Sequence, residues 1–321
     1  MNNTIFLCAV SLACVATVCA APAKGKVAAR RPAAQRSAAF PETAFRRTPY
    51  VGAIAVDAQT GEVLFERHAD AVARPASVTK LMTLLLCLED MHALKYDPTT
   101  RVTASVRCCQ ERPSSVGLKP GQSMTVDDLL MSIMVRSAND AAVLLAEHST
   151  AANAGRAIEP GDLQAFVLRM NNKARELGMA HTHYATPNGY PPKPGSGRPF
   201  DTSTCRDLVK LAQAVLLYPE VFRFTKTKLC SVTDGAGKPL KMVNHNNILV
   251  KDKQKILNEQ GESEVDGLKT GYIDAGGSSI ILTGARNGKR AIVVVVGSQT
   301  SKLRDQHARA LMVEALDRVA K

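Results

Sequence analysis

The strongest constraint on the fold is that strand-like segments stand at both ends of the body, with helix-like segments between them. The apolar run 51–56 and the segment 63–66 flank turn-forming residues at 57–61, which predicts a hairpin. Near the other end, Asn287-Gly288 separates the β-branched runs 279–285 and 291–297, and this dipeptide is typical of two-residue hairpins. We therefore predict an α+β fold in which both ends complete one antiparallel β-sheet, flanked by helices and a helical subdomain.

Helical periodicity fills the region between the two hairpins. Thr125 and Asp128 have the spacing of a capping box, and Gly178 stands where one periodic segment stops. The segments with helical spacing lie at 81–91, 129–135, 163–177 and 204–217, and a last one follows the second hairpin at 303–320. No internal repeat interrupts this pattern, so we predict a single folded domain over residues 49–321.

The first 48 residues have a different composition from the body. Residues 1–20 carry no charged side chain and end in the small-residue pattern Val18-Cys19-Ala20, which is typical of a cleaved export signal. An uncleaved anchor is the alternative. Residues 21–48 are rich in Ala, Pro and Arg without apolar periodicity, which predicts a flexible basic linker. We therefore expect an exported protein of the periplasm or cell envelope.

The net charge is +12, from 41 Lys and Arg against 29 Asp and Glu. Half of it comes from residues 21–48, where seven basic side chains accompany Glu42 alone. This segment would draw the chain to an anionic wall or membrane surface. A non-catalytic basic protein that binds wall polymer is the alternative to an enzyme. Basic and aromatic residues do not alternate along the chain as they do in proteins that stack bases, so we expect no nucleic-acid partner.

Cysteine and histidine spacing favours no metal or other cofactor. Beyond residue 20 the chain has Cys87, Cys108, Cys109, Cys205 and Cys230, with no Cys-x-x-Cys pair. In an oxidising compartment one or two disulfides remain open, and the odd count leaves at least one thiol.

The chemistry is indicated first by Ser77-Val78-Thr79-Lys80, at the start of the first long helix. Residues three apart on a helix share a face, so the Ser77 hydroxyl and the Lys80 amine can meet. A serine hydroxyl is a weak nucleophile without a neighbouring base, and a lysine becomes a base only when its pKa falls.

Two companion motifs follow in the chain. Ser137-Ala138-Asn139 lies between two predicted helices, and Lys269-Thr270-Gly271 lies on a predicted edge strand. We expect Gly271 to leave room for a substrate backbone beside that strand. The set Ser-x-x-Lys, Ser-x-Asn and Lys-Thr-Gly, in this order, favours a serine enzyme that forms an acyl intermediate.

With their flanking residues, these motifs closely resemble the low-molecular-mass D-alanyl-D-alanine carboxypeptidases, which are penicillin-binding serine peptidases of the S11 type. The resemblance covers roughly residues 50–318. It implies the penicillin-recognising serine-transferase fold, also called β-lactamase-like. It also implies hydrolysis of peptidoglycan stem peptides and covalent inhibition by β-lactam antibiotics.

The resemblance implies a role for each matching residue. Ser77 would be the nucleophile and Lys80 its base, Ser137 would pass a proton to the leaving amine, and Asn139 would bind the substrate amide. Lys269 and Thr270 would bind the terminal carboxylate, and the backbone N–H groups of Ser77 and Tyr272 would form the oxyanion hole. Asp207 matches a position that supports deacylation, with a simple helix-start carboxylate as the alternative.

Departures from the family pattern concern specificity. Asn188 stands where histidine is frequent, and the insertion 191–197 would reshape a loop beside the pocket. The chain ends at Lys321, as in short members that include DD-endopeptidases of peptidoglycan cross-links, so endopeptidase activity is an alternative. A class A β-lactamase would need an aspartate at Ala138 and a Glu-x-x-Leu-Asn element, which the sequence lacks.

Overall fold

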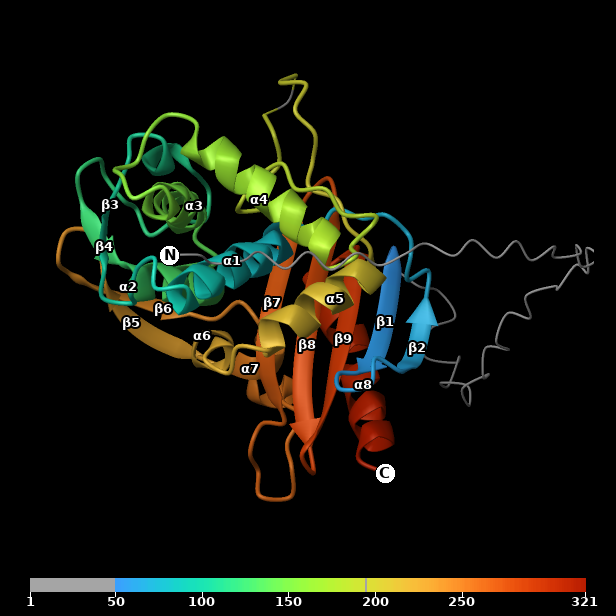
Figure 1. The fold of residues 1–321 in the computed structure, drawn as a ribbon. Coiled ribbons are helices and arrows are strands. Elements are labelled where there is room, and N and C mark those ends of the chain that lie inside the picture. The colour runs from blue at the N-terminus through green and yellow to red at the C-terminus, as the bar shows by residue number, and fades with distance from the viewer. Residues whose placement is uncertain (1–49, 194) are drawn as a thin grey trace, which may run out of the picture. The chain divides into compact units, whose positions relative to one another are not determined.

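The computed structural model describes residues 50–193 and 195–321, so the predicted signal 1–20 and linker 21–48 lie outside the described residues. Five strands form the main antiparallel sheet, in the order β2-β1-β9-β8-β7 (Figure 1). They are β1 (Gly52–Asp57), β2 (Val63–Arg67), β7 (Val265–Ile273), β8 (Gly277–Arg286) and β9 (Lys289–Ser298). Ile54 of β1 lies opposite Val294 of β9, which joins the two ends of the body. The predicted α+β class and both hairpins are confirmed.

The remaining elements lie between β2 and β7, apart from one helix after β9. The helices are α1 (Lys80–His92), α2 (Val126–Met131), α3 (Asn139–Asn153), α4 (Asp162–Glu176), α5 (Cys205–Leu216), α6 (Val221–Thr225), α7 (Asn247–Val250) and α8 (Ser301–Val319). Short 3-10 helices are η2 (Ala76–Thr79), η3 (Cys108–Gln110) and η5 (Asp252–Gln254), and η4 (Ser132–Arg136) is π-helical. Two small hairpins are β3 (Arg101–Thr103) with β4 (Ser123–Thr125), and β5 (Leu229–Thr233) with β6 (Pro239–Val243).

The sheet is buried on both faces because alternate residues of its strands enter two different cores. Ile54, Val294 and Val296 belong to the core shared with α1, α3 and α5, whereas Ala55 and Val295 belong to the core shared with α8. Figure 1 shows α8 behind the sheet and α1 and α5 in front of it. Burial on both faces explains why β9 reads as a continuous apolar run rather than an alternating one.

Two helix boundaries lie where local sequence signals predicted them. Thr125 caps α2 by accepting a hydrogen bond from the backbone N–H of Asp128 (3.1 Å), and Gly178 follows α4 with a φ of +68°. The expected helix 129–135 is interrupted, since α2 gives way to the π-helical segment η4 after Met131. In the described part of the chain, no helix combines the length and apolarity needed to cross a bilayer.

The described residues contain no disulfide bond. All five cysteines after residue 20 carry free thiols, and Cys87, Cys108 and Cys205 are buried among apolar side chains. Cys108 and Cys109 are neighbours whose sulfur atoms lie 3.8 Å apart without a bond. These residues therefore contribute to the core as small apolar side chains.

Candidate active site

The amine of Lys80 is fully buried and is the centre of the site. Its Nζ lies 2.9 Å from Ser77 Oγ, 2.8 Å from Asn139 Oδ1 and 2.7 Å from the carbonyl oxygen of Asn188. Ser77 sits in η2, one turn before Lys80 begins α1, and its side chain remains partly open to solvent. The three-residue spacing seen in the sequence thus brings nucleophile and base into hydrogen-bond contact.

These three partners leave room for a neutral amine that acts as a base toward Ser77. A neutral amine has two N–H groups and one lone pair, and two of the partners, the Asn139 and Asn188 oxygens, can only accept. Nζ donates to all three oxygens in the structure, and the Ser77 hydroxyl is the one partner that can also donate, so once the amine is neutral its lone pair can accept the Ser77 proton. The arrangement therefore fits a general base aimed at a serine nucleophile.

Burial and charge both favour that neutral form. Loss of hydration lowers the pKa of Lys80 well below its usual value, and the positive charge of Lys269 lowers it further. The carboxylates of Asp201, Glu111 and Asp140 act in the opposite direction. The dominant cause is desolvation, so the base depends on the site remaining closed around the amine.

Ser137 and Asn139 reach the site from the junction between η4 and α3. Ser137 has a left-handed backbone (φ +60°), which turns the chain from the π-helical segment into α3 and which few non-glycine residues adopt. Asn139 begins α3, and its backbone N–H donates to the carbonyl oxygen of Ser114 (2.7 Å). The sequence expectation of a tight interhelical loop is confirmed, and its strain is concentrated next to the reacting groups.

Lys269 reaches the site from the edge strand β7. Its Nζ donates to Ser137 Oγ (3.0 Å) and to the carbonyl oxygen of Thr270 (2.9 Å). Burial and the guanidinium of Arg304 lower the pKa of Lys269 to about 7. Ser137 therefore bonds to the second lysine, while Asn139 bonds to the first.

We expected Gly271 to leave room for a substrate backbone, but the structure gives a different reason for a glycine here. A Cβ atom at this position would lie 2.4 Å from the carbonyl oxygen of Pro75 and 3.0 Å from the backbone nitrogen of Ser77. The glycine therefore permits β7 to approach the protein's own η2 turn, rather than a substrate backbone. This close approach holds the Lys-Thr-Gly strand against the nucleophile.

The side chains of Tyr272 and Asp207 lie outside the hydrogen-bonded cluster around Lys80 and Lys269. Tyr272 is 59% exposed, and its hydroxyl donates to Asp274. Asp207 is buried near the start of α5, where it accepts hydrogen bonds from the backbone of His181 and the hydroxyl of Thr182. None of the hydrogen bonds of Asp207 joins it to Ser77 or Lys80.

Several basic side chains gather around Lys269 from distant parts of the chain, which sequence patterns did not reveal. Burial and the charges of Lys269, Arg136, Lys80 and Arg304 lower the pKa of His245 to about 4. Arg304 is itself buried and comes from α8, 35 positions beyond Lys269 in the chain. Arg304 is ion-paired with the buried Asp305, so Lys269 and Arg136 are the cations of this region that could favour an anionic ligand group.

A large cavity adjoins the lysine site. It has a volume of about 1160 Å³ and is lined by α4, by the segment 183–193 and by residues 107–112. Asn188 and Glu111 belong to its wall and are joined by a 3.0 Å hydrogen bond. Tyr190, Pro191 and Pro192 line it as well, which places part of the 191–197 insertion beside the site as the sequence predicted.

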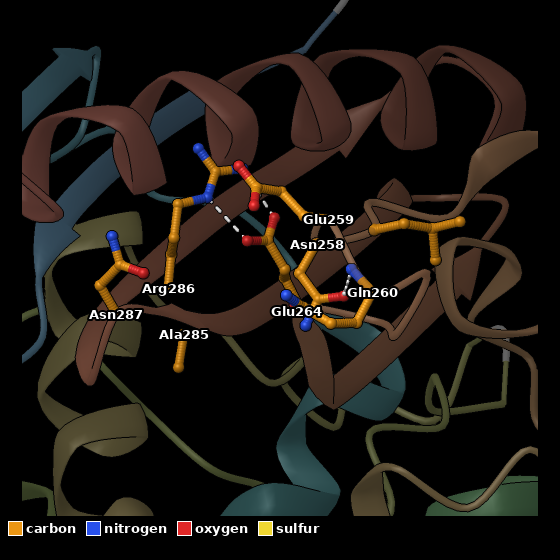
Figure 2. Close-up of a pocket in the computed structure, with 8 residues that line it drawn as sticks. Asn258, Glu259, Gln260, Glu264, Ala285, Arg286 and Asn287 are labelled. Carbon is orange, nitrogen blue, oxygen red and sulfur yellow. Dashed lines mark hydrogen bonds and ion pairs between the residues drawn. The ribbon is translucent and has the colours of Figure 1, made fainter.

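A smaller pocket of about 430 Å³ has different chemistry (Figure 2). Arg286 and Glu264 lie across it as a two-pronged ion pair, with N–O distances of 2.7 and 2.6 Å. Arg286 also pairs with Asp317, so its charge is already matched by two carboxylates. The Lys80 cluster is therefore the candidate active site.

The comparisons with known proteins agree with this geometry. The family model described as D-alanyl-D-alanine carboxypeptidase matches residues 49–300. The chain belongs to this family. Its fold is accordingly that of the penicillin-binding serine peptidases, as the motifs predicted.

Curated members of the D-alanyl-D-alanine carboxypeptidase family resemble the chain at moderate identity. The carboxypeptidase DacF of Bacillus subtilis is 29% identical over 81% of this chain and 60% of its own length. A D-alanyl-D-alanine endopeptidase of Escherichia coli is 28% identical over 76% of this chain and 70% of its own length. The chain spans about 60% of the length of the first carboxypeptidases that it matches.

Among solved structures, penicillin-binding protein D2 of Listeria monocytogenes in its ampicillin-bound form has a TM-score of 0.67 to this chain. The two are 28% identical, and the match covers 83% of this chain and 97% of that one. The same relative has also been seen with cefotaxime bound.

We predict that Lys269→Met raises the free energy of unfolding at pH 6. A buried lysine whose pKa is about 7 in the folded state, against 10.5 unfolded, costs stability while it is charged. This cost is full below pH 7 and disappears as the pH rises toward 10.5. At 1.36 kcal/mol per pH unit, the gain is at most about 4–5 kcal/mol at pH 6.

Urea unfolding at pH 6 and pH 9 measures this gain, which should shrink at the higher pH. Lys241→Met, at an exposed position of β6, is the matched control and should change little at either pH. A loss of stability in Lys269→Met that is equal at both pH values would contradict the prediction.

Proposed function

We propose that this protein is a serine-type D-Ala-D-Ala carboxypeptidase that cleaves peptidoglycan stem peptides through an acyl-enzyme and is acylated by β-lactams. The observation that carries the proposal is the buried Lys80 amine, 2.9 Å from Ser77 Oγ, with its other contacts occupied by two acceptors. Membership of the D-alanyl-D-alanine carboxypeptidase family supports the choice of substrate.

In the first step, the proton of the Ser77 hydroxyl moves to Lys80 Nζ as Oγ attacks the carbonyl carbon between two terminal D-alanines. The backbone N–H groups of Ser77 and Tyr272 would stabilise the resulting oxyanion, and one such donor is typically worth about 10²–10³ in rate. The tetrahedral intermediate then breaks its C–N bond. The proton that Lys80 accepted would pass through Ser137 to the departing nitrogen, so free D-alanine leaves, Lys80 is neutral again and Ser77 remains as an ester.

Recognition of the substrate would depend on the positive pocket. The terminal carboxylate would lie against Lys269 and Thr270, and this pairing of opposite charges also keeps Lys269 protonated. Asn139 would hydrogen-bond the substrate amide while holding Lys80. Water then attacks the ester, releases the shortened peptide and restores the Ser77 hydroxyl.

Cleavage of cross-links is the second candidate function, favoured by the similarity to the Escherichia coli endopeptidase. Incubation with purified muropeptides separates the two activities. Loss of one alanine from monomeric pentapeptides supports carboxypeptidase activity. Loss of dimers with gain of monomers supports endopeptidase activity.

We predict that Ser77→Ala abolishes both peptide cleavage and penicillin labelling, because no other hydroxyl lies against Lys80 Nζ among the residues that the structure describes. Intact mass spectrometry after incubation with penicillin checks this. Ser231→Ala, on the exposed face of β5, should gain the mass of the antibiotic as the wild type does. A penicillin adduct on a folded Ser77→Ala variant would contradict the proposal that Ser77 is the nucleophile.

We predict that Lys269→Met lowers kcat/KM for D-Ala-D-Ala peptides by about ten- to a hundredfold, the equivalent of one hydrogen bond to a charged group. Amidation of the substrate carboxylate should cost the wild type a similar factor and the variant much less, because the partner is already gone. The pH profile of the variant should also move to higher pH, since Lys269 lowers the pKa of Lys80. Multiplicative losses with an unchanged pH profile would exclude both roles.

We also propose that residues 1–20 direct export to the periplasm or cell envelope. The basic segment 21–48 would then associate with an anionic wall or membrane surface, and residues 49–321 would form the catalytic domain. The support is the charge pattern of the sequence. Deletion of 21–48 should leave turnover of a soluble peptide unchanged and weaken sedimentation with peptidoglycan at low salt, where such attraction is least screened. Equal sedimentation of both forms would remove the tethering role.

A further inference from the structure

The carboxylate of Asp201 is buried in the loop before α5 and accepts four hydrogen bonds. Its Oδ1 accepts from the backbone N–H groups of Ala185 (2.8 Å) and Thr186 (3.0 Å). Its Oδ2 accepts from the hydroxyls of Thr79 (2.8 Å) and Thr186 (3.2 Å). Asp201 therefore joins the end of η2 to the segment 185–189.

The two elements that Asp201 joins are those that meet at the general base. Thr79 directly precedes Lys80, and segment 185–189 provides the Asn188 carbonyl oxygen that accepts from Lys80 Nζ. Within that segment, the Thr186 hydroxyl also accepts from the backbone N–H of Gly189 (2.8 Å). The bonds to Asp201 thus continue on both sides of the Asn188 carbonyl.

Further contacts press segment 185–189 against the start of α1. The Thr83 hydroxyl donates to the carbonyl oxygen of Pro187 (2.6 Å). A Cβ atom at Gly189, whose φ is +74°, would lie 1.9 Å from the carbonyl oxygen of Ala76. Gly189 therefore lets the segment lie directly against the η2 turn that carries Ser77.

Asp201 also acts on Lys80 by its charge. Four charged groups perturb the pKa of Lys80: Lys269 lowers it, whereas Asp201, Glu111 and Asp140 raise it. Burial raises the pKa of Asp201 itself to about 6, against the opposing effect of its hydrogen bonds. Asp201 is therefore ionised at neutral pH, and its negative charge makes Lys80 a stronger base.

We propose that Asp201 is a positioning residue for the general base: it clamps segment 185–189 to the end of η2, and so holds the Asn188 carbonyl against the Lys80 amine. The proposal rests on the proposed function, because it assigns Lys80 the role of base. It adds a residue from a loop in which no motif of the sequence pointed to catalysis.

Two variants separate the charge of Asp201 from its hydrogen bonds. In Asp201→Asn, the amide oxygen can still accept from both backbone N–H groups, and the amide NH₂ faces the two threonine hydroxyls, which can turn to accept. This variant removes the charge and keeps the clamp. Thr79→Val removes one bond of the clamp and keeps the charge.

Glu264→Gln is the matched control. Glu264 is a buried carboxylate of similar exposure, 7% against 6% for Asp201, and it pairs with Arg286 in the smaller pocket (Figure 2). Its charge is not among the main influences on the pKa of Lys80. The control therefore reports what the loss of a buried carboxylate does to the protein in general.

The measurement is the second-order rate constant for acylation by a chromogenic cephalosporin as a function of pH. Asp201→Asn should shift the acid limb of the profile to lower pH, because removal of a negative charge lowers the pKa of Lys80. Thr79→Val should lower the plateau by about fivefold, the equivalent of one hydrogen bond, without moving the limb. Glu264→Gln should move neither.

The inference fails if both variants reproduce the wild-type profile, or if Glu264→Gln shifts the limb as Asp201→Asn does. A purely structural role for Asp201 would lower the amount of active enzyme without moving the limb. Failure of the wild type to acylate at all would instead overturn the proposed function, which keeps the two conclusions separate.

Discussion

The burial of the Lys80 amine is the interaction on which the rest of the structure depends. A lysine in water is protonated at neutral pH, and this one becomes a base because α1, the start of α3 and the segment 185–189 enclose it. Of the three oxygens that contact the amine, only Ser77 Oγ carries a proton that the neutral amine could take. Enclosure costs stability, which the two apolar cores on either side of the sheet offset.

The strained and close-packed positions of the fold cluster around this enclosure. Ala76 and Ser137 both have positive φ angles, and each lies directly before or within a site motif. Gly271 and Gly189 bring β7 and the segment 185–189 into contact with the η2 turn from different parts of the chain. Hydrogen bonds of Lys80 and Lys269 thus link side chains and backbone from four segments around the nucleophile, which fixes the geometry of the reacting groups.

Much of the fold was predictable because its signals are local. The Asn287-Gly288 hairpin, the Thr125 cap and the end of α4 at Gly178 each depend on a few neighbouring residues. The Ser-x-x-Lys spacing is local as well, so the contact between Ser77 and Lys80 followed from helix geometry. These predictions needed no knowledge of how distant segments pack.

The parts that sequence analysis missed depend on long-range packing. The Asn188 acceptor is a backbone carbonyl, which every residue has, and Arg304 approaches Lys269 only because α8 packs on the sheet. Asp201 lies 122 positions from its partner Thr79. The role expected for Gly271 was also wrong because it depends on long-range packing: the close neighbour of this glycine is the protein's own η2 turn.

The pKa of Lys80 is the most direct test of this account. Protein labelled with ¹³C at lysine Cε can be titrated by NMR, with the Lys80 signal assigned through Lys80→Arg and the exposed lysines as internal references. The account predicts that the Lys80 signal titrates well below the usual lysine value of 10.5, and that its pKa rises in Lys269→Met. An ordinary pKa for Lys80, unchanged by Lys269→Met, would contradict the claim that this chain holds a neutral lysine as its base.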